Sequence, residues 1–215
     1  MSGTEARTAR AEGTRELILA AAERLLAEHG VAAVSSRRVS EAARQGNNAA
    51  VGYHFGSKAD LLRAIVCKHT ASIELIRADL LTGIGASAEL RDWVSCLVRP
   101  FTEHLAALGN PTWYARFAVQ AAADPAYQEM MTDEAFSSPS FQRTVEGLNS
   151  CLPALPLPVR LERQQMTSHL LLQVCADRER SLASGVPPAR SSWADTATGL
   201  IDVLVALWQA PITMC

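Results

Sequence analysis

Residues 35–58, SSRRVSEAARQGNNAAVGYHFGSK, constrain the fold of this chain more than any other stretch. Ser35 or Ser36 can cap a short helix, because a serine hydroxyl accepts a backbone N–H that is unpaired at a helix start. The polar run RQGN then interrupts the apolar stripe with turn chemistry, since glycine and asparagine tolerate backbone angles that other residues avoid. A second short helix follows and stops at Gly56. Two short helices joined by a tight turn predict a helix-turn-helix.

The second helix of such a motif lies in the major groove of DNA, and the side chains at its start meet the base edges. Asn47 and Asn48 stand at that start, and asparagine can bind adenine through two hydrogen bonds. Small residues behind them allow the backbone to approach the DNA. The residues expected to contact DNA are Arg37, Arg38, Asn47, Asn48, Ala49, Gly52, Tyr53, His54 and Lys58.

The charge of this stretch supports a polyanionic partner. Its cationic side chains, Arg37, Arg38, Arg44 and Lys58, outnumber the single acidic residue Glu41, whereas the whole chain has a formal net charge of −2. A local positive surface on a mildly acidic protein is typical of a nucleic-acid-binding site. Lys58 follows a helix start, where a positive charge is unfavourable unless an anion is near, so a phosphate contact explains it and a solvated lysine is the alternative.

Three runs in this region resemble the TetR family of bacterial transcriptional regulators. They are LILAAAERLLAEHG, RRVSEAA, and YHFGSK followed by Leu61 and Leu62, and the resemblance covers roughly residues 14–66. The turn ARQGN is one residue longer than the family's usual turn, a departure at the register of Asn47 and Asn48. The resemblance implies a DNA-binding head, a helical body that binds a small-molecule effector, and a homodimer.

The rest of the chain has helical periodicity and no sustained alternation of apolar and polar residues, so we expect an all-α protein. A disordered arm is expected at 1–13, a helix-turn-helix DNA-binding domain at 14–58, and a ligand-binding and dimerisation domain at 59–215. Helical patterns in the body cover roughly 57–80, 88–108, 112–123, 126–151 with an interruption, 159–184 and 193–209.

The last predicted helix, 193–209, has only one narrow polar line. Asp195, Asp202 and Gln209 recur at a spacing of seven residues, and nearly every other position is apolar. A helix with so wide an apolar surface must be covered on two sides. One side is the core of the chain itself, and the other predicts a second copy that packs through helices near 159–184 and 193–209.

Aromatic and methionine side chains gather between residues 93 and 148. Such residues most often form a core, but prolines at 100 and 139 can stop neighbouring helices from packing flush, and methionine suits adaptable apolar surfaces. With the resemblance, this pattern predicts a pocket for a small apolar or aromatic ligand. The residues expected to line it are Trp93, Phe101, Trp113, Phe117, Met131 and Phe141.

Other kinds of site have no support in the sequence. The five cysteines are scattered without a C-x-x-C pair, and Cys67 and His69 are two residues apart on a predicted helix, so they point to different faces. We therefore expect no metal site, no cofactor, no catalytic residues and no enzyme activity. No apolar run is long enough to span a membrane, and the reduced cysteines suit a cytoplasmic protein.

The function predicted from the sequence is a dimeric repressor that binds a palindromic DNA operator and is released by its ligand. The alternative from another class is a helical small-molecule-binding protein or enzyme with a vestigial DNA-binding head. An activator, or a regulator that needs no ligand, is the alternative among DNA-binding proteins. Preference for one palindromic DNA sequence and a steep dependence of DNA binding on salt would distinguish the repressor from the protein with a vestigial head.

Overall fold

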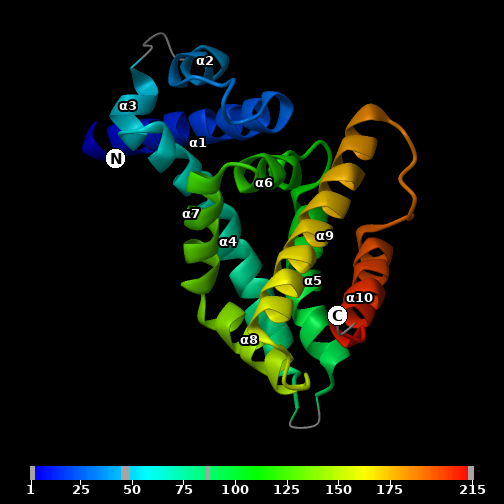
Figure 1. The fold of residues 1–215 in the computed structure, drawn as a ribbon. Helices are drawn as coiled ribbons and strands as arrows, with labels where there is room; N and C mark the ends of the chain where they lie inside the picture. The colour runs from blue at the N-terminus through cyan, green and yellow to red at the C-terminus, as the bar shows by residue number, and fades with distance from the viewer. Residues whose placement is uncertain (1–2, 45–48, 86–87, 213–215) are drawn as a thin grey trace.

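The computed structural model describes residues 3–44, 49–85 and 88–212. These described residues form ten α-helices and no strand, which confirms the all-α prediction. The helices are α1 (Gly3–His29), α2 (Ser36–Ala42), α3 (Ala50–Phe55), α4 (Lys58–Thr82), α5 (Leu90–Leu108), α6 (Tyr114–Ala122), α7 (Pro125–Phe136), α8 (Pro139–Ser150), α9 (Leu157–Ser184) and α10 (Trp193–Gln209). In Figure 1, α1, α2 and α3 form a head at one end of the molecule, and the later helices form the body.

A disordered arm was expected over residues 1–13, but residues 3–13 belong to the first helix, which begins at Gly3. No proline interrupts this stretch, and Gly13 inside the helix costs only about 1 kcal/mol relative to alanine. Glu5 lies in the first turn, where the partial positive charge of the helix end favours an acidic side chain. Once the packed part of α1 has formed, each added residue gains a helical hydrogen bond, so the helix extends backwards past Thr14.

The head packs around one small apolar core. Its buried side chains include Ile18, Leu19, Ala22, Leu26, Val34, Val39, Val51, Leu61 and Leu62. The Ser35 hydroxyl accepts a hydrogen bond from the Arg38 backbone N–H at 3.3 Å, which caps α2. Ser57 and Asp60 form a reciprocal capping box at the start of α4. The cap at Ser35 is one of the two that the sequence predicted.

Helix α4 connects the head to the body. Its first turns bury Leu61, Leu62 and Ile65 in the head core, and its later turns bury Ile73 and Leu81 in the body. Because one continuous helix contributes to both cores, a rotation or shift of α4 changes the position of the head relative to the body.

The body is arranged around α5, which packs mainly against α4, α8 and α10. The interrupted pattern at 126–151 proves to be two helices, α7 and α8, because Pro139 starts α8 and cannot continue α7. The Glu74 carboxylate of α4 accepts hydrogen bonds from the Ser138 hydroxyl and from the Ser140 backbone N–H at 3.1 Å. An acidic side chain of α4 thus holds the N-terminus of α8.

Two buried arginines of α9 fix both ends of α10. Arg163 donates to the Trp208 carbonyl at 2.8 Å and to the Ala210 carbonyl at the C-terminal end of α10. Arg178 donates to the Arg190 and Ser191 carbonyls just before α10 begins. Cationic donors satisfy the carbonyls that a helix end and a loop leave unpaired. The two last helices therefore form one unit of fixed geometry.

Candidate nucleic-acid interface

The expected recognition helix is α3, and it exposes the side that the sequence analysis assigned to DNA. Ala49, Gly52 and Tyr53 are exposed, with Tyr53 at 83%, whereas Ala50 and Val51 are buried in the head core. A Cβ atom at Gly52 would meet no heavy atom within 4 Å, so the space in front of this helix is open. Residues three and four apart lie on one face of a helix, which explains why these three side chains share the solvent side.

The residues just before this helix, 45–48, lie outside the described residues. Asn47 and Asn48, the expected base-reading side chains, belong to that stretch, so their contacts remain a prediction. Just before it, Arg44 has a φ of +54°, a conformation that non-glycine residues adopt uncommonly. The left-handed step of the turn thus occurs already at Arg44, which the sequence analysis did not expect.

The exposed side of α2 supplies positive charge beside α3. Arg37 and Arg38 are both exposed, and the Arg37 Nε donates to the Glu41 carboxylate at 2.8 Å. Such an exposed pair four residues apart contributes little to stability and can rearrange when a phosphate competes for the arginine. On the head's other side, the Arg15 guanidinium lies 5.0 Å from the centroid of the Phe55 ring and ties α1 to the end of α3.

Two further residues expected at the DNA are half-buried. His54 contacts the Tyr53 ring edge-on, with 5.0 Å between ring centroids. Lys58 is turned inward, since its ammonium donates a hydrogen bond to the Val31 carbonyl in the loop between α1 and α2. Burial lowers the pKa of Lys58, and the nearby Asp124 carboxylate partly opposes that effect. In this conformation the Lys58 ammonium is directed to the protein rather than to a phosphate.

The six side chains expected to line a ligand pocket occupy different environments. Phe101 and Phe117 are buried core residues that flank the Tyr114 ring, at centroid distances of 5.8 and 6.2 Å. Trp93 lies so close to Gly147 that a Cβ atom there would come within 2.3 Å of its ring. The other three, Trp113, Met131 and Phe141, are half-buried.

A hollow of about 470 Å³ exists elsewhere in the body. It is lined by Glu89, Leu90, Arg91, Cys151, Val205 and Gln209. None of the six expected ligand residues belongs to it, and its mixed polar lining differs from the apolar enclosure that small-molecule sites usually provide.

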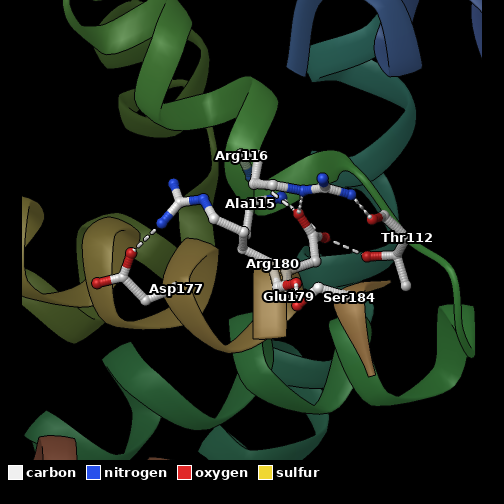
Figure 2. Close-up of polar contacts among 7 residues, drawn as sticks. All are labelled: Thr112, Ala115, Arg116, Asp177, Glu179, Arg180 and Ser184. Carbon is white, nitrogen blue, oxygen red and sulfur yellow. Dashed lines mark hydrogen bonds and ion pairs between the residues drawn. The ribbon is translucent and has the colours of Figure 1, made fainter. Parts of the chain in front are cut away.

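The structure also brings together a buried polar cluster that sequence reasoning missed. The Glu179 side chain of α9 is 1% exposed, and its carboxylate accepts hydrogen bonds from the Thr112 hydroxyl, the Ala115 and Arg116 backbone N–H groups, and Arg116 Nε at 3.2 Å. Figure 2 shows this carboxylate at the N-terminal end of α6, where a negative charge is favoured. The partners are more than 60 residues apart in sequence, so no local pattern could have revealed them.

Both C-terminal helices carry apolar side chains on the surface of the single chain. On α9 these are Leu157, Leu161, Met166 and Val174, and on α10 the large apolar side chain exposed in this way is Val203, at 53%. Leu200, Ile201, Leu204 and Trp208 of α10 are buried against the rest of the chain. The sequence predicted apolar surface on two sides of α10, and one of these sides lies in the core of the chain.

The described residues contain no group of three or more His, Cys, Asp or Glu side chains that could hold a metal ion. Within the same residues, no helix is long and apolar enough to cross a membrane. The four cysteines that the structure describes are free thiols, and burial raises the pKa of Cys67, Cys96 and Cys175.

An exposed short helix behind a basic helix, on a head joined to a larger helical body, defines a helix-turn-helix DNA-binding protein. Residues 18–65 match the family model described as bacterial regulatory proteins, tetR family. This match confirms, for the N-terminal domain, the resemblance to the TetR family seen in the sequence.

Among solved structures, the chain is similar to the crystal structure of RolR in complex with the ligand resorcinol. The sequence identity is 16%, the alignment covers 96% of this chain and 98% of that chain, and the TM-score is 0.48. The comparison with curated proteins gave no match.

Proposed function

We propose that this chain is a transcriptional repressor that binds a palindromic DNA operator as a homodimer and is released by a small apolar or aromatic ligand. The observation that carries the proposal is the solvent-facing side of α3, where Ala49, Gly52 and Tyr53 are exposed, together with the exposed arginines of α2. A vestigial head would have no physical reason to keep small residues and an exposed aromatic on the same side as the positive charge.

The two kinds of DNA contact have different consequences. In the proposal, Asn48 reads a base, so Asn48→Ala lowers operator affinity by about 1–3 kcal/mol and relaxes the preference at one base position. Arg38 binds a phosphate, so Arg38→Ala weakens binding to all sequences alike and lowers the salt slope by about 1. Lys58 can join the phosphate contacts only by leaving the Val31 carbonyl.

The DNA test begins with selection of bound sequences from a random pool, followed by titration of the enriched duplex at several salt concentrations. Leu75→Ala is the matched control for the head variants, because Leu75 is 74% exposed on α4. We expect one palindrome to be enriched and the control to bind it like the wild type. Enrichment of no sequence, together with a flat salt dependence, would overturn the proposal.

Dimerisation is proposed through α9 and α10. Four helices, two from each copy, would cover the exposed apolar side chains of both helices, and a two-fold axis would place the two recognition helices on half-sites about one DNA turn or more apart. Covering such side chains contributes about 25 cal/mol for each Å² of apolar surface removed from water. The arginine links from α9 to both ends of α10 support the proposal, because they present the two helices as one preformed surface.

Val203→Glu tests this interface, with Leu75→Glu as the control for adding a charge to an exposed leucine elsewhere. We expect the wild type and the control to sediment as dimers at micromolar concentration and Val203→Glu to sediment as a monomer with unchanged helix content. A monomeric wild type would remove the basis for palindrome reading. Leu204 is unsuitable for this test, since it is fully buried and a charge there would disturb the core.

Ligand release requires that the ligand bind the DNA-free conformation better than the DNA-bound one. A thousandfold loss of operator affinity corresponds to about 4 kcal/mol of difference in binding free energy. The half-buried residues Trp113, Met131 and Phe141 are the candidate contacts that a ligand could reach with the least repacking. The measurement is a screen of small aromatic compounds for those that raise the melting temperature and release the operator.

A further inference from the structure

Three ionisable side chains form a buried chain of hydrogen bonds from the head into the body. Glu23 lies on α1, His69 on α4 and His104 on α5. The Glu23 Oε2 is 2.9 Å from His69 Nε2, and His69 Nδ1 is 2.7 Å from His104 Nε2. Both imidazoles are nearly inaccessible, at 3% and 5% exposure. The helix that begins the head is thus connected to the central helix of the body through one histidine of α4.

The geometry restricts where protons can be. A carboxylate only accepts, so His69 Nε2 must carry a proton toward Glu23. Between the two imidazoles only one nitrogen can carry a proton, because two N–H groups facing each other at 2.7 Å cannot form a hydrogen bond. With both imidazoles neutral, His104 donates to His69, and with His69 protonated, His69 donates to His104. The chain of bonds accepts one proton without breaking.

That proton changes the charge of the link. Without it, the three groups carry one negative charge on Glu23, whose side chain is 13% exposed, and a charge in so largely buried a place is unfavourable. With it, the Glu23 carboxylate faces an imidazolium, and a neutral ion pair joins α1 to α4. A charge-assisted hydrogen bond is roughly twice as strong as a neutral one. A second proton would charge His104 as well and disrupt the bond between the imidazoles.

The surroundings hold these groups in place. The Tyr114 ring of α6 stacks on His69 at 3.7 Å between centroids and meets His104 edge-on at 6.0 Å. The Tyr114 hydroxyl is hydrogen-bonded to Thr70, and burial raises its pKa, so it stays protonated. The other titratable groups that influence Tyr114 are Cys67 of α4 and Glu134 of α7. Burial, followed in size by the neighbouring His69, lowers the pKa of His104 to about 4, so His104 stays neutral near pH 7.

We propose that the Glu23–His69–His104 chain is a protonation-dependent link that positions the DNA-binding head on the body. Uptake of one proton strengthens the link, and the head is then better ordered before it meets DNA. Because ordering a binding element in advance reduces the cost of association, operator affinity rises as the link tightens. This inference rests on the proposed function only for its effect on DNA, since the link itself exists without an operator. The three side chains are positioning residues and do not touch DNA.

Glu23→Gln is the conservative test, because the glutamine oxygen still accepts from His69 while the charge is removed. Glu16→Gln is the matched control, since Glu16 pairs with Lys68 at 2.7 Å between the same two helices but is exposed and involves no histidine. Operator dissociation constants of both variants and the wild type are measured from pH 8 to pH 5.5. The residues expected to contact DNA are the same in all three proteins, so their effects cancel in the ratios.

We expect the ratio of Glu23→Gln to wild-type dissociation constants to rise at least fivefold as the pH falls from 8 to 5.5. For Glu16→Gln the ratio stays within twofold. Hydrogen exchange of the α1 amides, measured without DNA, is expected to show the same pH-dependent difference between Glu23→Gln and wild type. A pH-independent ratio in both measurements overturns the inference. If no protein binds an operator but the exchange difference remains, the link stands and the proposed function fails.

Discussion

Glu179→Gln removes one charge from the buried cluster that joins α9 to α6. In the native chain one carboxylate oxygen accepts from Thr112 and from the Ala115 N–H, and the other accepts from the N–H and Nε of Arg116. Glutamine replaces one of these oxygens with an NH₂ group, which would face two donors. The Arg116 side chain, 12% exposed, also loses its counter-ion, while its hydrogen bond to the Thr112 carbonyl remains.

The size of the effect follows from these contacts. A hydrogen bond to a charged group contributes about 1.5–3 kcal/mol, and breaking one partner of a buried ion pair costs about 3–5 kcal/mol. Because glutamine preserves the shape and half of the acceptors, we expect a loss of about 3 kcal/mol in the free energy of unfolding. With a urea m-value of about 3 kcal/mol/M, the midpoint falls by about 1 M.

Asp177→Asn is the matched control, because Asp177 and Arg180 form an ion pair on the same helix with side chains more than half exposed (Figure 2). Exposed pairs contribute about 0–1 kcal/mol, so the control should shift the midpoint by no more than about 0.3 M. The assay is urea unfolding followed by circular dichroism at one protein concentration, since the stability of a dimer depends on concentration. Equal midpoints for the two variants would refute the assignment of burial as the cause.

Two further perturbations test the packing and the titration of the body. Gly147→Ala places a methyl group against the Trp93 ring and should lower the free energy of unfolding by about 1–3 kcal/mol. Gly13→Ala, at an open position of a helix, should raise it by up to about 1 kcal/mol. Urea midpoints measure both changes, and an unchanged midpoint for Gly147→Ala would mean that Trp93 moves freely. The lowered pKa of His104 favours its neutral form in the folded chain. The contribution of His104 to the free energy of unfolding is therefore complete above pH 6.5 and is lost as the pH falls toward about 4. Between pH 7 and 4.5, the free energy of unfolding should fall by about 2–3 kcal/mol more for the wild type than for His104→Gln. Parallel plots of the free energy of unfolding against pH for the two proteins would contradict this expectation.

Local signals were sufficient for the boundaries of several helices. The bounds 193–209 predicted for the last helix are those of α10, because Ser192 caps its start and the apolar pattern is continuous. The capping box at Ser57 and the positive φ of Gly30 were likewise predictable from residue type alone. Each of these features depends on side chains within one helical turn of the position in question.

Features that depend on distant residues were not predictable in this way. His69 and His104 are 35 residues apart, and each reads in the sequence as an isolated histidine. Leu17 is apolar like the residues that follow it, yet it is 57% exposed, while Leu19 is buried. The helical period of 3.6 residues leaves the edges of an apolar stripe ambiguous, and only the position of the neighbouring helices decides which residues are covered.

The two buried clusters have a common consequence for signalling in the proposed repressor. Helix α6 packs against α1 on one side and against α9 on the other, and the Glu179 carboxylate fixes its N-terminal end to α9. The head is therefore connected to the proposed dimer helices through α6, and to the centre of the body through the Glu23–His69–His104 chain. Tyr114 belongs to both connections, since it opens α6 and stacks on His69. A ligand that displaces Tyr114 would therefore loosen both connections at once.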